Sequence, residues 1–467
     1  MAKYEIKDGI AIIPEGTQEI DECAFLGCER LTSVVIPDSV TKIGECAFGG
    51  CFGLASVTIP DSVTEIEEWA FSDCSGLSSV VIPDSVTEIG ERAFFGCSAL
   101  TEIKVAEGNP KYDSRKNCNA IIETARNKLI VGCKSTNIPD SVTEIGEWAF
   151  YGCYRLTSVT IPNSVTKIGK RAFSGCHSLT STTIPNSVTE IGDSAFSWCE
   201  SLPSVTIPIC CNIKDVFMGC FKLTSVVIAD SVTEIGEMAF EGCKELTSVT
   251  IPNSVTKIGE GAFFGCESLT SVVIPDSVTK IGDSAFSWCE SLPSVTIPNS
   301  VTEIEDSAFS WCKNLSSVTI PDSVTEIGEE AFLGCERLTS VVIPDSVTEI
   351  GKRAFSRCNG LTSITIPDSV TKIGEWTFLG CSCLTSVVIP DSVTEIGEGV
   401  FSECDSLETI TLGSNIDKIH TEVFSSCSAL KTIYVPAKKT DYYKKRLPEN
   451  LHSLIVEFEP IKSNNDY

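Results

Sequence analysis

Apolar residues return along this chain with a period of 23 residues. The clearest copy runs from Leu338 to Gly360 and reads LTSVVIPDSVTEIGKRAFSRCNG, with apolar residues at repeat positions 1, 4, 6, 10, 13, 17, 18 and 21. Seventeen leucines open such copies, among them Leu31, Leu54, Leu77, Leu100, Leu156 and finally Leu430. A repeat of fixed period indicates one supersecondary unit that stacks on its neighbours, so the pattern predicts a repeat solenoid.

Each copy predicts its own short elements. Positions 1 to 6 are rich in β-branched residues, and the proline at position 7 ends this strand because it has no N–H to donate. Asp-Ser then predicts a turn, positions 10 to 13 a second extended piece, and positions 15 to 21 a helical turn that ends near glycine. We therefore expect a leucine-rich solenoid with a continuous parallel β-sheet and short helical turns on the other edge. A single copy buries too little to offset its ordering entropy and should be unfolded alone.

Departures from the period predict the divisions of the chain. Residues 1–30 are interpreted as an N-terminal capping repeat, and residues 31–430 as the solenoid. Within it, residues 101–132 carry turn signals between apolar stretches, which predicts a hairpin-like insertion, and the copy at residues 202–222 is two residues short. Residues 431–467 leave the pattern and are expected to form a C-terminal cap followed by a disordered tail.

The consensus LxxVxIPxxVxxIxxxAFxxC resembles the BspA-like leucine-rich repeats, also called the TpLRR class. The match extends from Ile13 and Pro14 to the final copy, and leucine, proline, Ala-Phe and cysteine hold their offsets in more than a dozen copies. The resemblance implies a repeat protein of a kind commonly associated with cell surfaces and with binding host proteins or other cells. The spacing by itself supplies only the fold.

The charge narrows the classes of partner. With 35 Lys and Arg against 63 Asp and Glu, the formal net charge is −28, so anionic polymers are repelled and nucleic-acid binding is not expected. No apolar run approaches about 18 residues and the first residues show no hydrophobic signal core, so neither a transmembrane segment nor a secretory signal is expected. The sequence alone therefore indicates the cytoplasm unless an export signal has been removed, whereas the resemblance implies the cell surface or secretion.

The 24 cysteines are mostly a feature of the repeat. Seventeen occupy position 21, where a small buried hydrophobe is expected, and no C-x-x-C motif occurs. We therefore predict a ladder of buried, reduced thiols. Cys23 and Cys46 stand at position 16 of adjacent copies, where a disulfide is an alternative, while Cys118, Cys210 and Cys211 are expected to pack locally.

Neither a metal site nor a catalytic site is expected. Position 15 carries an acidic column, which could attract calcium or a basic partner, but one carboxylate per copy does not gather the six to eight oxygens that calcium needs. A solvated face is the preferred interpretation. The three histidines, His177, His420 and His452, lie far apart and outside any repeated constellation of nucleophile and carboxylate, so we expect no enzyme activity and no cofactor.

Six tryptophans are the candidate partner-binding residues. Position 16 carries Trp69, Trp148 and Trp376, and position 20 carries Trp198, Trp288 and Trp311. In a helical turn residues four apart share a face, and each tryptophan is matched by a small or short residue at the other position, so one site would be filled from either end. Trp288 and Trp311 fall on consecutive copies and predict the largest aromatic patch, since tryptophan is enriched among interface hot spots. The alternative is that the indoles only shield neighbouring copies.

Two function classes follow. Outward strand positions 3 and 5 are nearly invariant, whereas positions 16, 19, 20, 22 and 23 vary, which favours specific contacts along the turn edge. The first class is a non-enzymatic interaction or adhesion module, expected to be monomeric, that binds a protein or cell-surface partner, a glycan included. The second is an intracellular structural scaffold without a single specific ligand.

Overall fold

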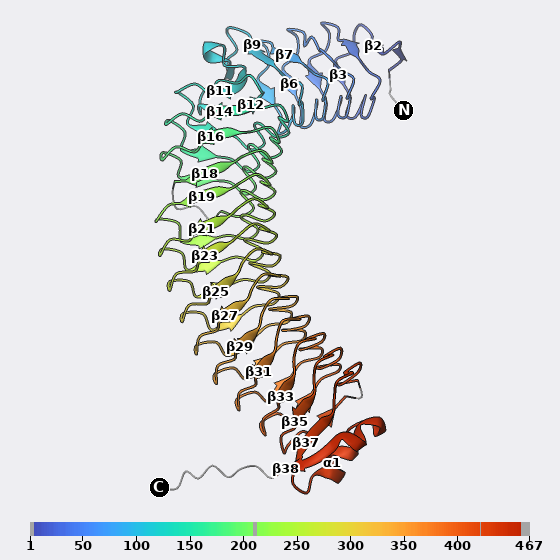
Figure 1. Ribbon diagram of the computed structural model, residues 1–467. Coiled ribbons are helices and arrows are strands. Elements are labelled where there is room, and N and C mark those ends of the chain that lie inside the picture. The colour runs from blue at the N-terminus through green and yellow to red at the C-terminus, as the bar shows by residue number, and fades with distance from the viewer. Residues whose placement is uncertain (1–3, 209–212, 421, 459–467) are drawn as a thin grey trace. The chain divides into compact units, whose positions relative to one another are not determined.

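The computed structural model describes residues 4–208, 213–420 and 422–458, and its contacts divide the chain into two units, Met1–Ser231 and Val232–Tyr467. Each unit is a stack of repeat copies whose strands lie side by side and run parallel (Figure 1), which confirms the predicted leucine-rich solenoid. Successive copies pair in register: Ser363 lies opposite Ser386, and Ile364 opposite Val387. This register follows from the identical offset of every apolar position, because a slip of one residue would turn the buried face of a strand outward.

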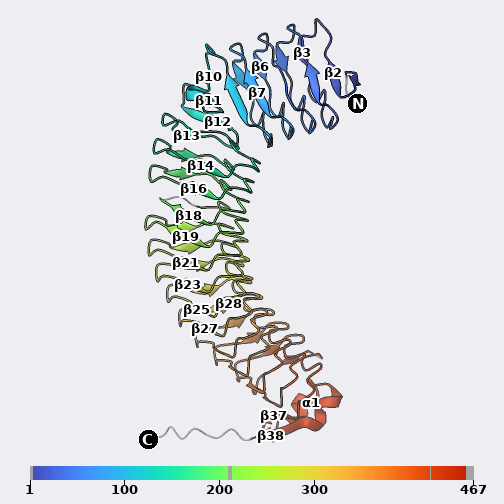
Figure 2. The same cartoon turned by 45° about the horizontal axis from the view of Figure 1, so that its top comes forward.

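Two sets of strands recur in the first unit (Figures 1 and 2). Repeat positions 3 to 6 form β2 (Ile10–Ile12), β4 (Ser33–Val35), β7 (Ser79–Ile82), β9 (Glu102–Val105), β14 (Ser158–Thr160), β16 (Ser181–Thr183), β18 (Ser204–Ile207) and β19 (Ser225–Ile228). Positions 12 and 13 form β3 (Glu19–Ile20), β5 (Lys42–Ile43), β6 (Glu65–Ile66), β8 (Glu88–Ile89), β13 (Glu144–Ile145), β15 (Lys167–Ile168) and β17 (Glu190–Ile191). Near the N-terminus, β1 (Ile6–Lys7) pairs antiparallel with β2.

The second unit repeats both sets. The first set contains β21 (Ser248–Thr250), β23 (Ser271–Val273), β25 (Ser294–Thr296), β27 (Ser317–Thr319), β29 (Ser340–Val342), β31 (Ser363–Thr365), β33 (Ser386–Val388), β35 (Thr409–Thr411), β37 (Thr432–Pro436) and β38 (Ile455–Phe458). The second set contains β20 (Glu234–Ile235), β22 (Lys257–Ile258), β24 (Lys280–Ile281), β26 (Glu303–Ile304), β28 (Glu326–Ile327), β30 (Glu349–Ile350), β32 (Lys372–Ile373), β34 (Glu395–Ile396) and β36 (Lys418–Ile419).

The predicted helical turns at positions 15 to 21 are wrong. Among the described residues, helix occurs only at η1 (Arg115–Asn117), α1 (Thr440–Lys444) and η2 (Glu449–Leu454). The Ala-Phe segment instead makes tight turns with left-handed residues at positions 16 and 20, such as Met238 (φ 51°) and Gly242 (φ 70°).

The reason is a third ladder of hydrogen bonds between copies. The N–H groups at positions 16, 18 and 20 donate to the carbonyls at positions 15, 17 and 19 of the next copy. In the second unit these are Met238 to Glu260 (2.8 Å), Phe240 to Ala262 (2.8 Å) and Gly242 to Phe264 (2.7 Å). A helix would direct these N–H groups along its own axis, so the stack favours an extended, kinked segment that points them at the neighbouring copy.

The core of each unit consists of columns of identical side chains. Consecutive phenylalanines at position 18 stack nearly parallel, with ring centroids 5.1 Å apart for Phe25 and Phe48 and 5.2 Å for Phe263 and Phe286. The cysteines of position 21 form a second column. They are unpaired and mostly buried, and in most copies the thiol donates to the carbonyl of the position-18 residue of the copy before it, as Cys289 does to Phe263 (3.3 Å). Cys153, which follows the insertion, donates to the carbonyl of Gly132 instead. Cys23 and Cys46 are also free thiols, and Cys210 and Cys211 lie outside the described residues.

Residues 101–132 interrupt this regular stacking in the first unit. After β9 the chain forms β10 (Tyr112–Asp113), η1, β11 (Ala120–Glu123) and β12 (Lys128–Gly132), in which β10 and β11, and β11 and β12, pair antiparallel. β12 then pairs parallel with β13, so it takes the place of the copy that would otherwise precede residues 133–155.

Beyond the last repeat, the second unit ends in a different arrangement. β37 pairs parallel with both β35 and β38. In the chain, α1 and η2 lie between β37 and β38. Tyr443 of α1 is fully buried and donates its hydroxyl proton to the carbonyl of Gly413. The expected tail falls largely outside the described residues, and the division of the chain into caps and solenoid stays a prediction. In the part of the chain that the structure describes, no helix has the length and apolarity needed to cross a membrane.

Candidate functional site

The strand face and the turn edge present different chemistry, as the sequence predicted. Outward positions 3 and 5 give exposed serine beside exposed valine or threonine, for example Ser340 and Val342, the latter 77% exposed. The tryptophans lie on the turn edge, at the two left-handed positions 16 and 20. Positions 16 and 20 are not joined by a helical turn, so helical spacing does not place their side chains on one face.

Trp288 and Trp311 form a stacked pair in the second unit. Their ring centroids lie 5.1 Å apart at an angle of 19°, and Trp288 remains 37% exposed. The Trp311 ring lies against the backbone of Gly334 in the next copy, where an added Cβ would be 2.7 Å from the ring. The ammonium of Lys313 lies 5.5 Å from the centroid of Trp288 and 2.7 Å from a carboxylate oxygen of Glu290. Trp288 and Trp311 thus form a partly exposed aromatic surface, with the charged groups of Lys313 and Glu290 beside it.

Trp69 and Trp148 are arranged differently, around an arginine. The guanidinium carbon of Arg92 lies 4.9 Å from the Trp69 centroid and 4.8 Å from the Trp148 centroid. Phe95 and Tyr151 add stacked rings with centroids 4.1 Å apart, and Trp148 meets each of them edge-on. Both indoles are half-buried. These two tryptophans therefore contribute much of their surface to contacts within the first unit.

The remaining two tryptophans lie apart from these groups. Trp198, 43% exposed, covers Gly219 and meets Phe221 edge-on at 5.7 Å. Trp376 covers Gly399. The ammonium nitrogen of Lys352 and the guanidinium carbon of Arg353 lie 4.7 and 5.0 Å from the centroid of the Trp376 ring. The structure thus brings together Trp288 with Trp311, and Trp69 with Trp148 through Arg92, but it does not gather all six into one surface.

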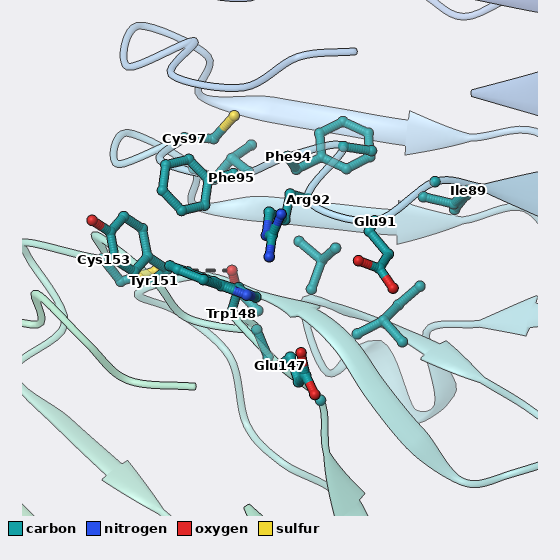
Figure 3. A pocket seen from close by; sticks show the side chains of 18 of the residues that line it. Ile89, Glu91, Arg92, Phe94, Phe95, Cys97, Glu147, Trp148, Tyr151 and Cys153 are labelled. Atoms are coloured by element: carbon teal, nitrogen blue, oxygen red, sulfur yellow. Dashed lines mark hydrogen bonds between the residues drawn. The ribbon is translucent and has the colours of Figure 1, made fainter. Parts of the chain in front are cut away.

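A cavity that the sequence did not predict lies in the first unit, where residues 101–132 interrupt the stack. We call it the seam cavity: it measures about 240 Å³ and lies between the segments 89–97 and 146–153, with β12 along one side. Phe94, Cys97 and Leu100 are buried residues that line the cavity. The rings of Phe95, Trp148 and Tyr151 line it as well (Figure 3). The only signal in the sequence was the length of the insertion. Residues 101–132 replace one regular copy, so the carbonyl groups that this copy would have offered to the third ladder of hydrogen bonds are missing.

The charged groups of the turn edge show no constellation typical of a metal centre. Among the described residues, no group of three or more His, Cys, Asp or Glu could hold a metal ion. In the second unit, a groove of about 610 Å³ is lined by alternating acids and lysines, among them Glu395 and Lys418, whose charged atoms lie 2.8 Å apart. The hydrogen bond from Lys418 lowers the pKa of Glu395, whereas burial raises the pKa of Glu326.

His177 lies in the first unit, and His420 and His452 lie in the second. The His177 ring is tilted against Tyr154 with centroids 4.9 Å apart, and its Nε2 lies 3.9 Å from a carboxylate oxygen of Glu200. The His452 ring lies 2.9 Å from the carbonyl oxygen of Leu447 near the end of the second unit. Neither contact includes a nucleophile, and His420 lines the charged groove without one.

Comparison with known proteins identifies the family. Residues 9–121, 128–215, 211–339 and 325–446 match the model of the BspA type leucine rich repeat region (6 copies), which covers most of the chain. The chain belongs to the BspA-type leucine-rich repeat family. Proteins of this kind usually mediate protein interaction or adhesion and are generally not enzymes.

Solved structures of leucine-rich repeat proteins are similar to the chain. The chain is 28% identical to a leucine-rich repeat protein from Bacteroides ovatus, with a TM-score of 0.56, over 86% of this chain and 91% of that one. It is 30% identical to a leucine rich cell surface protein from Faecalibacterium prausnitzii, over 80% of this chain and 90% of that one, with a TM-score of 0.42. It is 27% identical to the T. pallidum leucine rich repeat protein TpLRR, over 46% of this chain and 86% of that one, with a TM-score of 0.27. No curated protein matches the chain significantly.

Proposed function

We propose that this chain is an adhesion module that binds a protein partner at a cell surface through the turn edge of its solenoid. Membership of the BspA-type family supports a role in protein interaction. The observation that carries the proposal is the stacked and partly exposed pair Trp288 and Trp311. Tryptophan is enriched at interface hot spots, because it buries a large surface at a small cost in side-chain entropy.

The surroundings of this pair suit a protein interface. Both indoles are pre-stacked, so binding would order few side chains and lose little conformational entropy. The charged border from Lys313 and Glu290 resembles the polar rim of an interface around an apolar centre. The uniform strand face offers no comparable anchor.

The proposal can be tested by measuring how the purified chain binds to intact eukaryotic cells. The double variant Trp288→Ala/Trp311→Ala should weaken binding by about 2 kcal/mol or more while its thermal unfolding changes little. Trp376→Ala is the matched control, because this tryptophan lies on the same edge of the second unit without an aromatic partner among the described residues. Protease treatment of the cells should abolish binding, whereas glycosidase treatment should not.

The location of the chain in its own cells tests the alternative of an intracellular scaffold. Brief protease treatment of intact producing cells should release peptides of this chain if it is displayed on the surface. Full protection of the chain, together with unchanged cell binding by the double variant, would contradict the proposal and favour the scaffold.

A further inference from the structure

The seam cavity is the place in the first unit where the third ladder of hydrogen bonds is interrupted. In the copy before it, the N–H groups of Trp69, Phe71 and Asp73 donate to carbonyls of the next copy at 3.2, 2.8 and 2.6 Å. The equivalent groups at the cavity belong to Arg92, Phe94 and Gly96. Among the described residues, none of these three N–H groups has a hydrogen-bond acceptor. Phe94 and Gly96 are buried residues, and buried N–H groups without a partner are rare in folded proteins, so their presence beside a cavity is informative.

Two side chains add further donors to the same cavity. The Nε atom of Arg92 and the Nε1 atom of Trp148 are both buried, and neither has an acceptor in the described part of the chain. The guanidinium carbon of Arg92 lies within 5 Å of the ring centroids of Trp69 and Trp148. The Nη1 atom of Arg92 lies 3.7 Å from a carboxylate oxygen of Glu68. Guanidinium nitrogens and indole N–H groups donate but do not accept. A ligand that satisfies this cavity must therefore offer hydrogen-bond acceptors, such as carboxylate oxygens.

The size and walls of the cavity describe the rest of such a ligand. About 240 Å³ is larger than the engineered cavity of about 150 Å³ that holds benzene in another protein, so a small apolar group and a carboxylate fit together. Ala93, Phe94 and Leu100 are at least 95% buried and form an apolar interior. In Figure 3, the rings of Phe95 and Tyr151 lie to one side of Arg92, and the carboxylates of Glu91 and Glu147 lie to the other. These two carboxylates disfavour a multiply charged anion such as phosphate.

We propose that the seam cavity binds a monocarboxylate carried on a small apolar group. Its oxygens accept hydrogen bonds from the Arg92 side chain, the Trp148 indole and the nearby backbone N–H groups, and its apolar group packs against Phe94 and Leu100. Such a carboxylate is found in a small organic acid and at the C-terminus of a peptide that ends in an apolar residue. This site lies in the first unit and does not depend on the proposed adhesion through Trp288 and Trp311.

Calorimetric titration of the full chain tests the proposal with defined probes. The probes are 3-phenylpropionate, hexanoate, the neutral analogue 3-phenylpropanol, inorganic phosphate, and acetylated Gly-Gly-Phe with a free or an amidated C-terminus. We expect saturable binding of at least one carboxylate with a Kd below about 1 mM, and no binding of the alcohol or phosphate in that range. Tighter binding of the free-acid peptide, lost on amidation, would identify a chain terminus as the natural ligand, whereas binding of the free acids alone would identify a small molecule.

Two variants and a matched control separate recognition from folding. Arg92→Met keeps the aliphatic stem but removes the charge, and should weaken binding at least about tenfold. Trp148→Phe keeps an aromatic wall but removes the indole N–H, and should weaken binding about three- to tenfold. Arg353→Met is the control, since Arg353 occupies the same repeat position in the second unit but its backbone N–H donates to Glu375 at 2.9 Å.

The outcomes decide the proposal. Absence of saturable carboxylate binding below about 1 mM, equal binding of acid and alcohol, or equal weakening by Arg353→Met would each overturn it. If Arg92→Met does not fold, as judged by circular dichroism, the folded Trp148→Phe variant decides instead, and unchanged affinity there would overturn the proposal.

Discussion

The column of buried thiols should make this protein sensitive to alkali. Burial raises the pKa of Cys153, Cys220, Cys312 and Cys358 from the ordinary value of 9.0 to about 12. All four side chains are at least 93% buried, and each thiol donates to a backbone carbonyl of the residues before it. In the folded state these groups therefore stay protonated through mildly alkaline conditions.

The magnitude follows from the protons that each state binds. Above pH 9 the unfolded chain loses thiol protons that the folded chain keeps, so the stability contributed by each thiol is full below about pH 9 and is lost as the pH rises toward 12. At about pH 10 the loss is about 1.4 kcal/mol for each thiol. The four thiols together remove about 6 kcal/mol, which is comparable to the whole stability of many domains.

Urea unfolding followed by circular dichroism, with a reductant present, measures this loss. The stability of the parent chain should fall steeply between about pH 7.5 and about pH 10. In the double variant Cys312→Ala/Cys358→Ala the fall should be smaller by about 3 kcal/mol, because two of the titrating thiols are gone. At about pH 7.5 the variant itself should be less stable than the parent, because alanine leaves small voids in the column.

A matched control and a clear negative result complete this test. Cys383→Ala removes an exposed thiol that lies outside the column, so it controls for the loss of a cysteine without disturbing the column. If the double variant loses stability with pH as steeply as the parent does, the thiols of the column are not buried and protonated, and the reasoning is refuted.

Three further predictions follow from the packing between copies. Gly334 and Gly380 occupy the same repeat position with φ of +72° and +71°, but an added Cβ would lie 2.7 Å from the Trp311 ring at Gly334 and 3.6 Å from the nearest atom at Gly380. Gly334→Ala should therefore lower the urea-derived stability by about 1 kcal/mol more than Gly380→Ala does. Equal losses would show that the indole pair moves freely. A thiol reagent should label the exposed cysteines quickly and the buried thiols of the position-21 column only after denaturant is added, whereas rapid labelling of these buried thiols in the native chain would contradict their burial. Tyr443→Phe removes the hydrogen bond to the Gly413 carbonyl and should lower the stability of the last copies by about 1 to 2 kcal/mol. Hydrogen exchange of β35 and β37 measures this loss, and exchange in the N-terminal copies of the second unit should not change.

Much of the fold could be predicted because the same apolar and polar positions recur in every regular copy. Leu338, Val341 and Ile343 are buried while Ser340 and Val342 are exposed, as alternation along a strand requires. A register error in any one copy would expose its apolar residues and leave its neighbours' hydrogen bonds unpaired, so the period of 23 residues was a sufficient guide to the stack.

The Ala-Phe segment shows where local reasoning failed. Its alanine, phenylalanine and glycine are compatible with a helical turn, and nothing within a single copy excludes one. What excludes it is the next copy, whose carbonyls at positions 15, 17 and 19 accept the N–H groups of this segment. Left-handed residues as large as Trp288 (φ 61°) occur there because this ladder holds the backbone in place.

The sequence by itself determined the solenoid, the register of its strands and the columns of leucine, phenylalanine and cysteine, because these depend on a spacing that each copy repeats. Only the tertiary structure decided which tryptophans meet and where the stack is interrupted. Trp69 and Trp148 are 79 residues apart in the chain, yet both contact Arg92, because the insertion at residues 101–132 takes the place of a copy between them. The donors of Arg92 and Trp148 at the seam cavity exist for the same reason: their acceptors would have come from a regular neighbour, and no rule of local sequence states which neighbour a copy will have.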